Sequence, residues 1–157
     1  MSDSRFDNMD DSNSASPAQW AYRLRRSVGS KRGQAFLREL LAALDAVPGH
    51  RLIGGSMKAE GSNVCALGAY AAWREMNERG ITWRGAVREL PRADGDDDEG
   101  WLVTCRLVRD RYDVAWTLAY EIAEFNDENA ASATDDPADR WRDVRDYVAG
   151  LIVGGVA

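Results

Sequence analysis

The clearest pattern in the chain is an amphipathic repeat at residues 34–47. Apolar residues recur there at three- and four-residue spacing, and charged residues occupy positions between them. This spacing places the apolar side chains on one face of an α-helix. Ser30 can accept a hydrogen bond from an amide of the first turn, whereas Pro48 and Gly49 cannot continue a helix. The pattern therefore predicts a helix with a physical cause for each end.

Helical spacing also occurs at residues 17–28, 69–80, 114–125 and 137–151. Pro17 and Pro137 suit a first helical turn, where a missing amide costs little. Asp136 is the expected N-cap of the last helix, and Asp113 is the expected N-cap of the helix that precedes it. Residues 101–108 fit either a helix or a short strand.

Two short runs, residues 51–58 and 63–70, are separated by a connection that contains Gly61. A glycine in such a short connection suits a tight reversal, so we expect a hairpin, with an irregular loop as the alternative for the first run. The whole pattern predicts an α+β protein that is predominantly α-helical. Its four to five helices surround one core, and a small β-hairpin follows the second helix.

The length of 157 residues suits one folded domain. Residues 1–16 are acidic and rich in Ser and Asn, which predicts a disordered acidic tail, and residues 17–157 are expected to form a single globular domain. Within that domain, residues 81–100 have little periodicity and end in an acidic run. We therefore expect an exposed acidic loop at the end of this segment.

The acidic run places Asp94, Asp96 and Asp98 at the spacing of a calcium-binding loop. Glu99 stands where such a loop needs glycine, and Cys105 stands where it needs its closing glutamate. A solvated acidic loop without a metal ion is therefore the favoured interpretation, and a metal site is the lesser alternative.

The chain shows no signal peptide and no run of about 20 apolar residues, so we expect a cytoplasmic protein without a membrane partner. Its two cysteines, Cys65 and Cys105, are expected to be buried free thiols, because disulfides are rare in that compartment.

The charge is unevenly distributed along the chain, although the net charge is −6. Residues 18–60 carry eight Lys and Arg against three Asp and Glu, and five of these cations lie within ten residues: Arg23, Arg25, Arg26, Lys31 and Arg32. Such a cluster predicts contact with nucleic-acid phosphates or with an acidic protein. The competing interpretation is a solvated helix surface balanced by the acidic C-terminal half.

Residues 101–125 could form two helices joined by a turn, the arrangement of a helix-turn-helix DNA reader. The second of these helices has glutamates and no Lys or Arg, so DNA phosphates would repel it. We therefore expect a structural corner packed on the core. Trp116 and Tyr120 are expected to be exposed on this helix and are candidate protein contacts.

Few catalytic arrangements are compatible with the sequence. His50 is the single histidine, which excludes sites with several histidine ligands, and a Ser-His-Asp or Cys-His arrangement would have to use it. The glycines near Lys31 lack the spacing of a phosphate loop, and Gly54 and Gly55 lack that of a dinucleotide fingerprint. We therefore predict no cofactor and no catalytic residue.

Six runs carry a resemblance to known proteins. They include KRGQAFL at 31–37, LLAALDA at 40–46, RLI at 51–53 and VCALGA at 64–69, with two longer runs at 108–127 and 137–148. In these runs the chain resembles a group of small uncharacterised proteins from bacterial, prophage and phage genomes. The resemblance covers most of the chain. Residues 81–100 depart from it, which implies an insertion there, and the resemblance implies neither an activity nor catalytic residues.

The sequence therefore predicts a non-enzymatic accessory or regulatory protein that binds a protein partner, and the resemblance implies phage or mobile-element type. The first alternative is a nucleic-acid-binding protein that uses the basic cluster. The second is an enzyme that uses His50 or Cys65. Nothing in the pattern indicates an oligomeric state.

Overall fold

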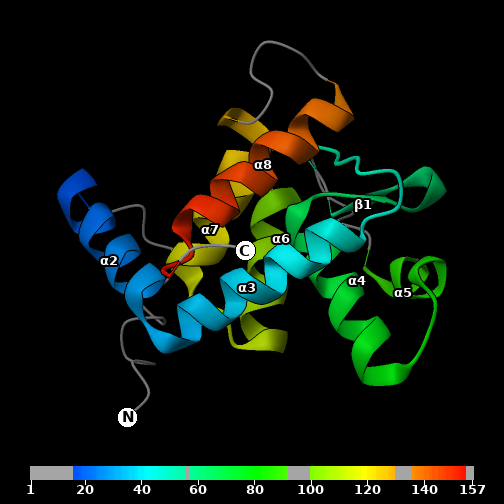
Figure 1. Cartoon of the computed structure of the whole chain (residues 1–157), viewed down its shortest axis with the longest axis horizontal. Coiled ribbons are helices and arrows are strands. Elements are labelled where there is room, and N and C mark those ends of the chain that lie inside the picture. The colour runs from blue at the N-terminus through cyan, green and yellow to red at the C-terminus, as the bar shows by residue number, and fades with distance from the viewer. Residues whose placement is uncertain (1–15, 56, 92–99, 130–135, 155–157) are drawn as a thin grey trace.

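A computed structural model describes residues 16–55, 57–91, 100–129 and 136–154 (Figure 1). The helices in these ranges are α2 (Pro17–Gly29), α3 (Lys31–Ala46), α4 (Ala66–Arg79), α5 (Trp83–Glu89), α6 (Gly100–Tyr112), α7 (Trp116–Glu124) and α8 (Pro137–Leu151). Two strands, β1 (Lys58–Ala59) and β2 (Asn63–Val64), flank a 3-10 turn at Glu60–Ser62, and a π-helical turn at Phe125–Asn129 follows α7. Apart from Ser16, the predicted acidic tail lies outside the described residues, and so does the predicted acidic loop at 94–99.

The fold class is confirmed in its coarse form, because the chain is predominantly helical and an antiparallel hairpin follows the second helix. The expected count of four to five helices is wrong, since the described residues hold seven. One additional helix is α5, which is too short to show a clear apolar period. Thr82 caps α5 by accepting a hydrogen bond from the Gly85 amide, at 3.1 Å. The other is α6, which the sequence left open between helix and strand.

Helix α3 crosses the middle of the molecule and packs against α2, α4 and α8 (Figure 1). Its predicted apolar face is confirmed, with Phe36, Leu37, Leu40, Leu41 and Leu44 all buried. Each fully buried side chain of this kind stabilises the fold by about 1.5–3 kcal/mol. Ser30 caps the helix as predicted, and its Oγ accepts a hydrogen bond from the Gly33 amide at 2.9 Å.

The hairpin is shorter than expected. Lys58 pairs with Val64 and Ala59 with Asn63 in antiparallel register. The second run leaves the strand early, because Cys65 caps α4 and the helix begins at Ala66. Gly68 allows this close packing, since a Cβ there would lie 2.3 Å from the Met57 carbonyl oxygen.

The turn between α6 and α7 differs from the prediction. Asp113 has a φ of +57° and follows the end of α6, where its amide donates to the Arg109 carbonyl oxygen at 3.0 Å. Asp113 therefore terminates α6 in the left-handed conformation that Asp tolerates, and the expectation that it caps α7 is wrong. Helix α7 begins three residues later, at Trp116, after Ala115.

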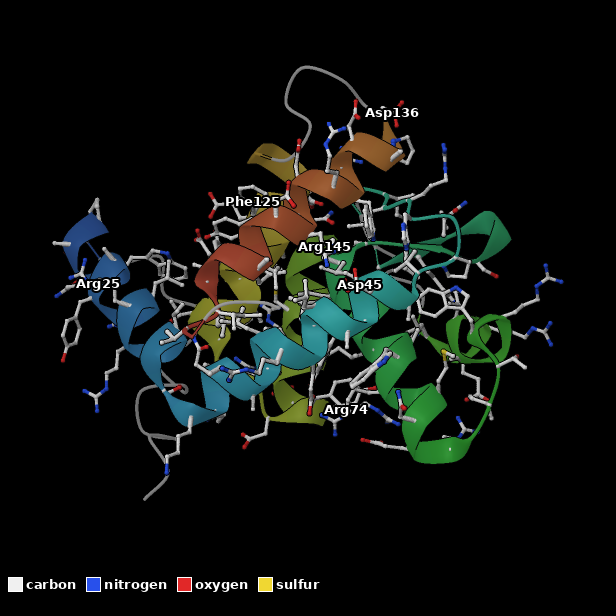
Figure 2. The ribbon with its side chains drawn as sticks, viewed as in Figure 1. Arg25, Asp45, Arg74, Phe125, Asp136 and Arg145 are labelled. Carbon is white, nitrogen blue, oxygen red and sulfur yellow. The ribbon has the colours of Figure 1, made fainter. Side chains whose placement is uncertain are left out.

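Helix α8 closes the fold above α3. Asp136 caps it as predicted, accepting a hydrogen bond from the Ala138 amide at 2.8 Å. Figure 2 shows Arg145 of α8 and Asp45 of α3 facing one another, and their ion pair measures 2.6 Å. Within the described residues, no helix has both the length and the apolar character that crossing a membrane requires.

Candidate interaction surface

Helix α2 lies at one edge of the molecule and packs against α3 and α7 (Figure 1). Its first turn is closed by a capping box, in which Ser16 Oγ accepts from the Gln19 amide and the Gln19 side chain accepts from the Ser16 amide. The inner side of α2 is apolar, and Trp20 meets Tyr120 of α7 edge to face with ring centroids 5.0 Å apart. No residue of α2 is fully buried, so the helix is attached along one side only.

The corner between α2 and α3 depends on a glycine. A Cβ at Gly33 would lie 1.7 Å from the Ser27 carbonyl oxygen, so no larger residue fits unless the corner opens. Ser30 Oγ also donates to that carbonyl oxygen, at 2.8 Å. The approach angle of α2 is therefore set by its contact with the first turn of α3.

The buried side chain of Gln34 secures the same corner. Its Nε2 donates to the carbonyl oxygens of Val28, at 2.6 Å, and Leu151, at 3.0 Å. Its Oε1 accepts from the Val153 amide at 2.8 Å. One amide group thus joins the end of α2 to the end of α8, and both of its polar atoms are satisfied as a buried amide requires.

The outer side of α2 carries Tyr22, Arg25 and Arg26, which we call the outer stripe. These residues are three and four positions apart and therefore share one face of the helix. All three are exposed, and the Tyr22 side chain has a relative exposure of 57%. Arg26 Nη1 lies 3.5 Å from the Tyr22 hydroxyl. Figure 2 shows Arg25 pointing away from the body of the molecule.

The predicted basic cluster divides into two groups in the structure. Within the described ranges, no ion pair joins Arg23, Arg25 or Lys31 to a carboxylate. Arg32 instead contacts the turn between α6 and α7, where its Nη2 lies 3.3 Å from Asp113 Oδ1. The fold therefore brings Arg25 and Arg26 together with Tyr22, a residue that the sequence did not single out. In the sequence, Tyr22 lies one helical turn before two arginines and outside the apolar face of the helix. This spacing could have identified it.

The expected exposure of Trp116 is wrong. Its relative exposure is 8%, and the Arg109 guanidinium lies over its ring at 5.1 Å from the centroid. Tyr120 is partly buried between Trp20 and Trp116, because α2 docks on this face of α7. Tyr120 thus helps to hold α2, and the contact of Trp116 and Tyr120 with a partner stays a prediction.

The two residues of the enzyme alternative lie in separate surroundings. Cys65 is buried at the start of α4, where its Sγ accepts from the Gly68 amide at 3.4 Å, and burial raises its thiol pKa to about 12. A thiol in this state is a poor nucleophile at neutral pH. His50 is exposed, stacks on Trp141 with ring centroids 3.9 Å apart, and its Nε2 lies 3.2 Å from the Asp45 carbonyl oxygen. Cys105 is also a buried free thiol, so the prediction for both cysteines is confirmed.

The other arginine-rich region surrounds Glu75 of α4, whose relative exposure is only 4%. Its Oε1 accepts from the Tyr112 hydroxyl and from Arg111 Nε, both at 2.9 Å, and Arg79 Nη1 lies 3.6 Å from Oε2. Burial alone would raise the pKa of Glu75, but the hydrogen bonds from Tyr112 and Arg111 outweigh it and leave that pKa below 4.5.

Two more arginine contacts extend this region into neighbouring helices. Arg79 pairs with Glu89 of α5, and Arg74 pairs with Glu78 at 2.6 Å and with Glu39 of α3 at 3.4 Å. We call the whole set the α4 ionic network; its members are Glu39, Arg74, Glu75, Glu78, Arg79, Glu89 and Arg111. Its ion pairs join four helices, so the network gives a structural tie.

Metal binding was considered for the acidic side chains. In the part of the chain that the structure describes, no group of three or more His, Cys, Asp or Glu residues is placed to hold a metal ion. The predicted loop with Asp94, Asp96 and Asp98 lies outside that part.

Comparisons with protein-family models, curated proteins and solved structures give no match to this chain. Function is therefore inferred from the side chains themselves, and the exposed basic side of α2 is the strongest candidate surface.

Proposed function

We propose that the chain is a non-enzymatic accessory or regulatory protein that acts by binding a protein partner through α2. The supporting observation is the basic side of this helix, where Arg25 and Arg26 are exposed, Arg23 is half-buried and no acidic residue is present. The phage or mobile-element type implied by the resemblance belongs to the same proposal.

The energetics favour such a use of α2. Arg25 is exposed and has no carboxylate partner among the described residues, so it breaks no internal ion pair when it binds. Arg and Tyr are also enriched among the side chains that dominate protein–protein affinity, and both stand on the outer stripe. The network around α4 lacks this property, because its arginines are already paired.

A pull-down from host lysate tests the proposal. The tagged chain is compared with a variant in which Arg23, Arg25 and Arg26 become Gln, each with and without nuclease. The matched control changes three exposed arginines outside α2 to Gln, namely Arg51, Arg84 and Arg88. We expect one dominant protein that survives nuclease with the wild type and the control and is lost with the α2 variant. Recovery of no protein would overturn the function, and equal recovery with the α2 variant would overturn the surface.

Nucleic-acid binding is the second candidate, favoured by the absence of described ion-pair partners for Arg23, Arg25 and Lys31. It predicts that a fluorescent DNA duplex binds with an affinity that falls steeply with salt, because bound cations release counterions. A variant with Ala at all five cluster positions, including Arg26 and Arg32, should then bind much more weakly. Equal duplex affinity for this variant and the wild type would exclude the candidate.

A further inference from the structure

We infer that the outer stripe of α2 recognises an acidic segment of a protein in which an apolar side chain lies between carboxylates. This inference rests on the proposed function and specifies the chemistry of its partner. It assigns the central contact to Tyr22 and the flanking contacts to Arg25 and Arg26.

The geometry of the outer stripe supports this chemistry. Tyr22 lies one helical turn before the two arginines, so its Cα lies about 5 Å from theirs along the helix axis, and Arg26 Nη1 lies 3.5 Å from the Tyr22 hydroxyl. A guanidinium group can bind a carboxylate with two parallel hydrogen bonds, which favours an acidic partner. The exposed Tyr22 ring can pack against an apolar group beside those carboxylates.

The surroundings of α2 favour a short acidic segment over nucleic acid. Helix α7, on which α2 packs, carries Glu121 and Glu124 and no Lys or Arg. The whole chain has a net charge of −6. A nucleic-acid backbone carries a negative charge at every step and is repelled by this net charge, whereas a peptide segment brings its few charges to the stripe alone.

The outer stripe is also held in place before any partner arrives. Trp20 fixes the inner side of α2 against Tyr120, and Gln34 ties its last turn to the end of α8. Binding therefore needs no ordering of the helix itself, which lowers the entropic cost of association.

Backbone amide NMR of the full chain tests the inference, with a short peptide that has one tryptophan between pairs of glutamates as the probe. We expect shifts confined to α2, and roughly tenfold weaker binding for Tyr22→Ala and for the double variant Arg25→Gln, Arg26→Gln. Val153→Ala removes another exposed apolar side chain, with a relative exposure of 63%, and should change nothing. The same peptide with Gln in place of Glu should bind weakly or not at all. Retained dispersion of the spectra shows that each variant is folded.

Three outcomes would overturn the inference. The first is a shift pattern centred outside α2, and the second is unchanged peptide affinity in Tyr22→Ala. The third is an oligothymidylate of similar length that shifts the α2 resonances at lower concentration than the peptide, which would assign the stripe to nucleic acid. If Tyr22→Ala retains the protein captured from lysate while the triple arginine variant loses it, the proposed function stands and this inference fails.

Discussion

The arginines of α2 and those around α4 belong to the same residue type but have different surroundings. Arg79 and Arg111 approach the buried Glu75, and Arg74 contacts Glu39 and Glu78. In α2, Arg23 and Arg25 have no carboxylate partner among the described residues.

The neighbouring helices cause this difference. Helix α4 is surrounded by α3, α5 and α6, and α3 and α5 each present a glutamate to it while α6 presents Arg111. Helix α2 rests on α7 through the contact of Trp20 with Tyr120, and Arg25 is exposed on another side of the helix. Paired arginines tie helices together, and arginines without an internal partner are available to another molecule.

The largest expected effect comes from Gly33→Ala. The added Cβ collides with the Ser27 carbonyl oxygen, so the corner must open, at a cost of about 3 kcal/mol in the free energy of unfolding. Urea denaturation measures this change, and partner binding through α2 should fall with it. Gly29→Ala is the matched control, because its Cβ would meet nothing within 4 Å, and it should change stability by less than about 1 kcal/mol. Equal effects of the two substitutions would contradict the close approach at Gly33.

The next effect is expected from Glu75→Gln. The substitution removes the charged acceptor shared by Tyr112 and Arg111, which should cost about 2 kcal/mol. Glu78→Gln removes an exposed partner of Arg74 and should cost less than about 0.5 kcal/mol in the same urea experiment. The Glu75→Gln variant should bind the partner as the wild type does at temperatures where it is folded. Loss of partner binding in the folded variant would contradict the assignment of binding to α2 and of stability to the α4 ionic network.

A change of pH should have an intermediate effect on the free energy of unfolding. Because the folded pKa of Glu75 lies below 4.5, its contribution to stability is complete above pH 4.5 and is lost as the pH falls through the folded pKa. The difference in unfolding free energy between the wild type and Glu75→Gln should therefore shrink on acidification. A difference that stays constant down to acid pH would show that Glu75 does not carry a lowered pKa.

The smallest effect is expected from changing Arg23 and Arg25 to Gln. Since neither has a carboxylate partner among the described residues, the free energy of unfolding should change by less than about 0.5 kcal/mol. Arg111→Gln should cost clearly more, because it strips the buried Glu75 of a hydrogen-bonded cation. Thermal unfolding of the two variants side by side makes the test, and a larger loss in the α2 variant would reverse the comparison.

Local signals were enough to predict much of the fold. The spacing of α3, the Ser30 cap and the Asp136 cap with Pro137 are all decided within one or two turns of the chain. The position of the hairpin agrees with the prediction, but its strands are shorter. The second run enters α4 early, where Gly68 packs closely on Met57.

Contacts between distant residues explain what the sequence could not predict. Trp116 was expected to be exposed because nothing local shows that the Arg109 guanidinium of α6 lies over its ring. The docking of α2 on α7 through Trp20 and Tyr120 leaves Tyr22 exposed. No local pattern distinguishes Glu75 from other helical glutamates. Its partner Arg111 lies 36 positions away in the chain and reaches it only through the packing of α6 on α4. The charge pattern of α2 was visible in sequence, but the division between Arg25 and the tethered Arg32 was not.

The hydrogen bonds of Gln34 also bear on the order in which the molecule is assembled. Residues 34 and 151 are separated by 117 positions, so this contact closes a very long loop and forms only after the chain between them has collapsed. During synthesis, α2 leaves the ribosome well before α8, and its last turn lacks this anchor until the final helix is made. The proposed recognition helix is thus the first helix of the described chain to be translated and among the last to be fixed in place, which delays a rigid binding surface until folding is nearly complete.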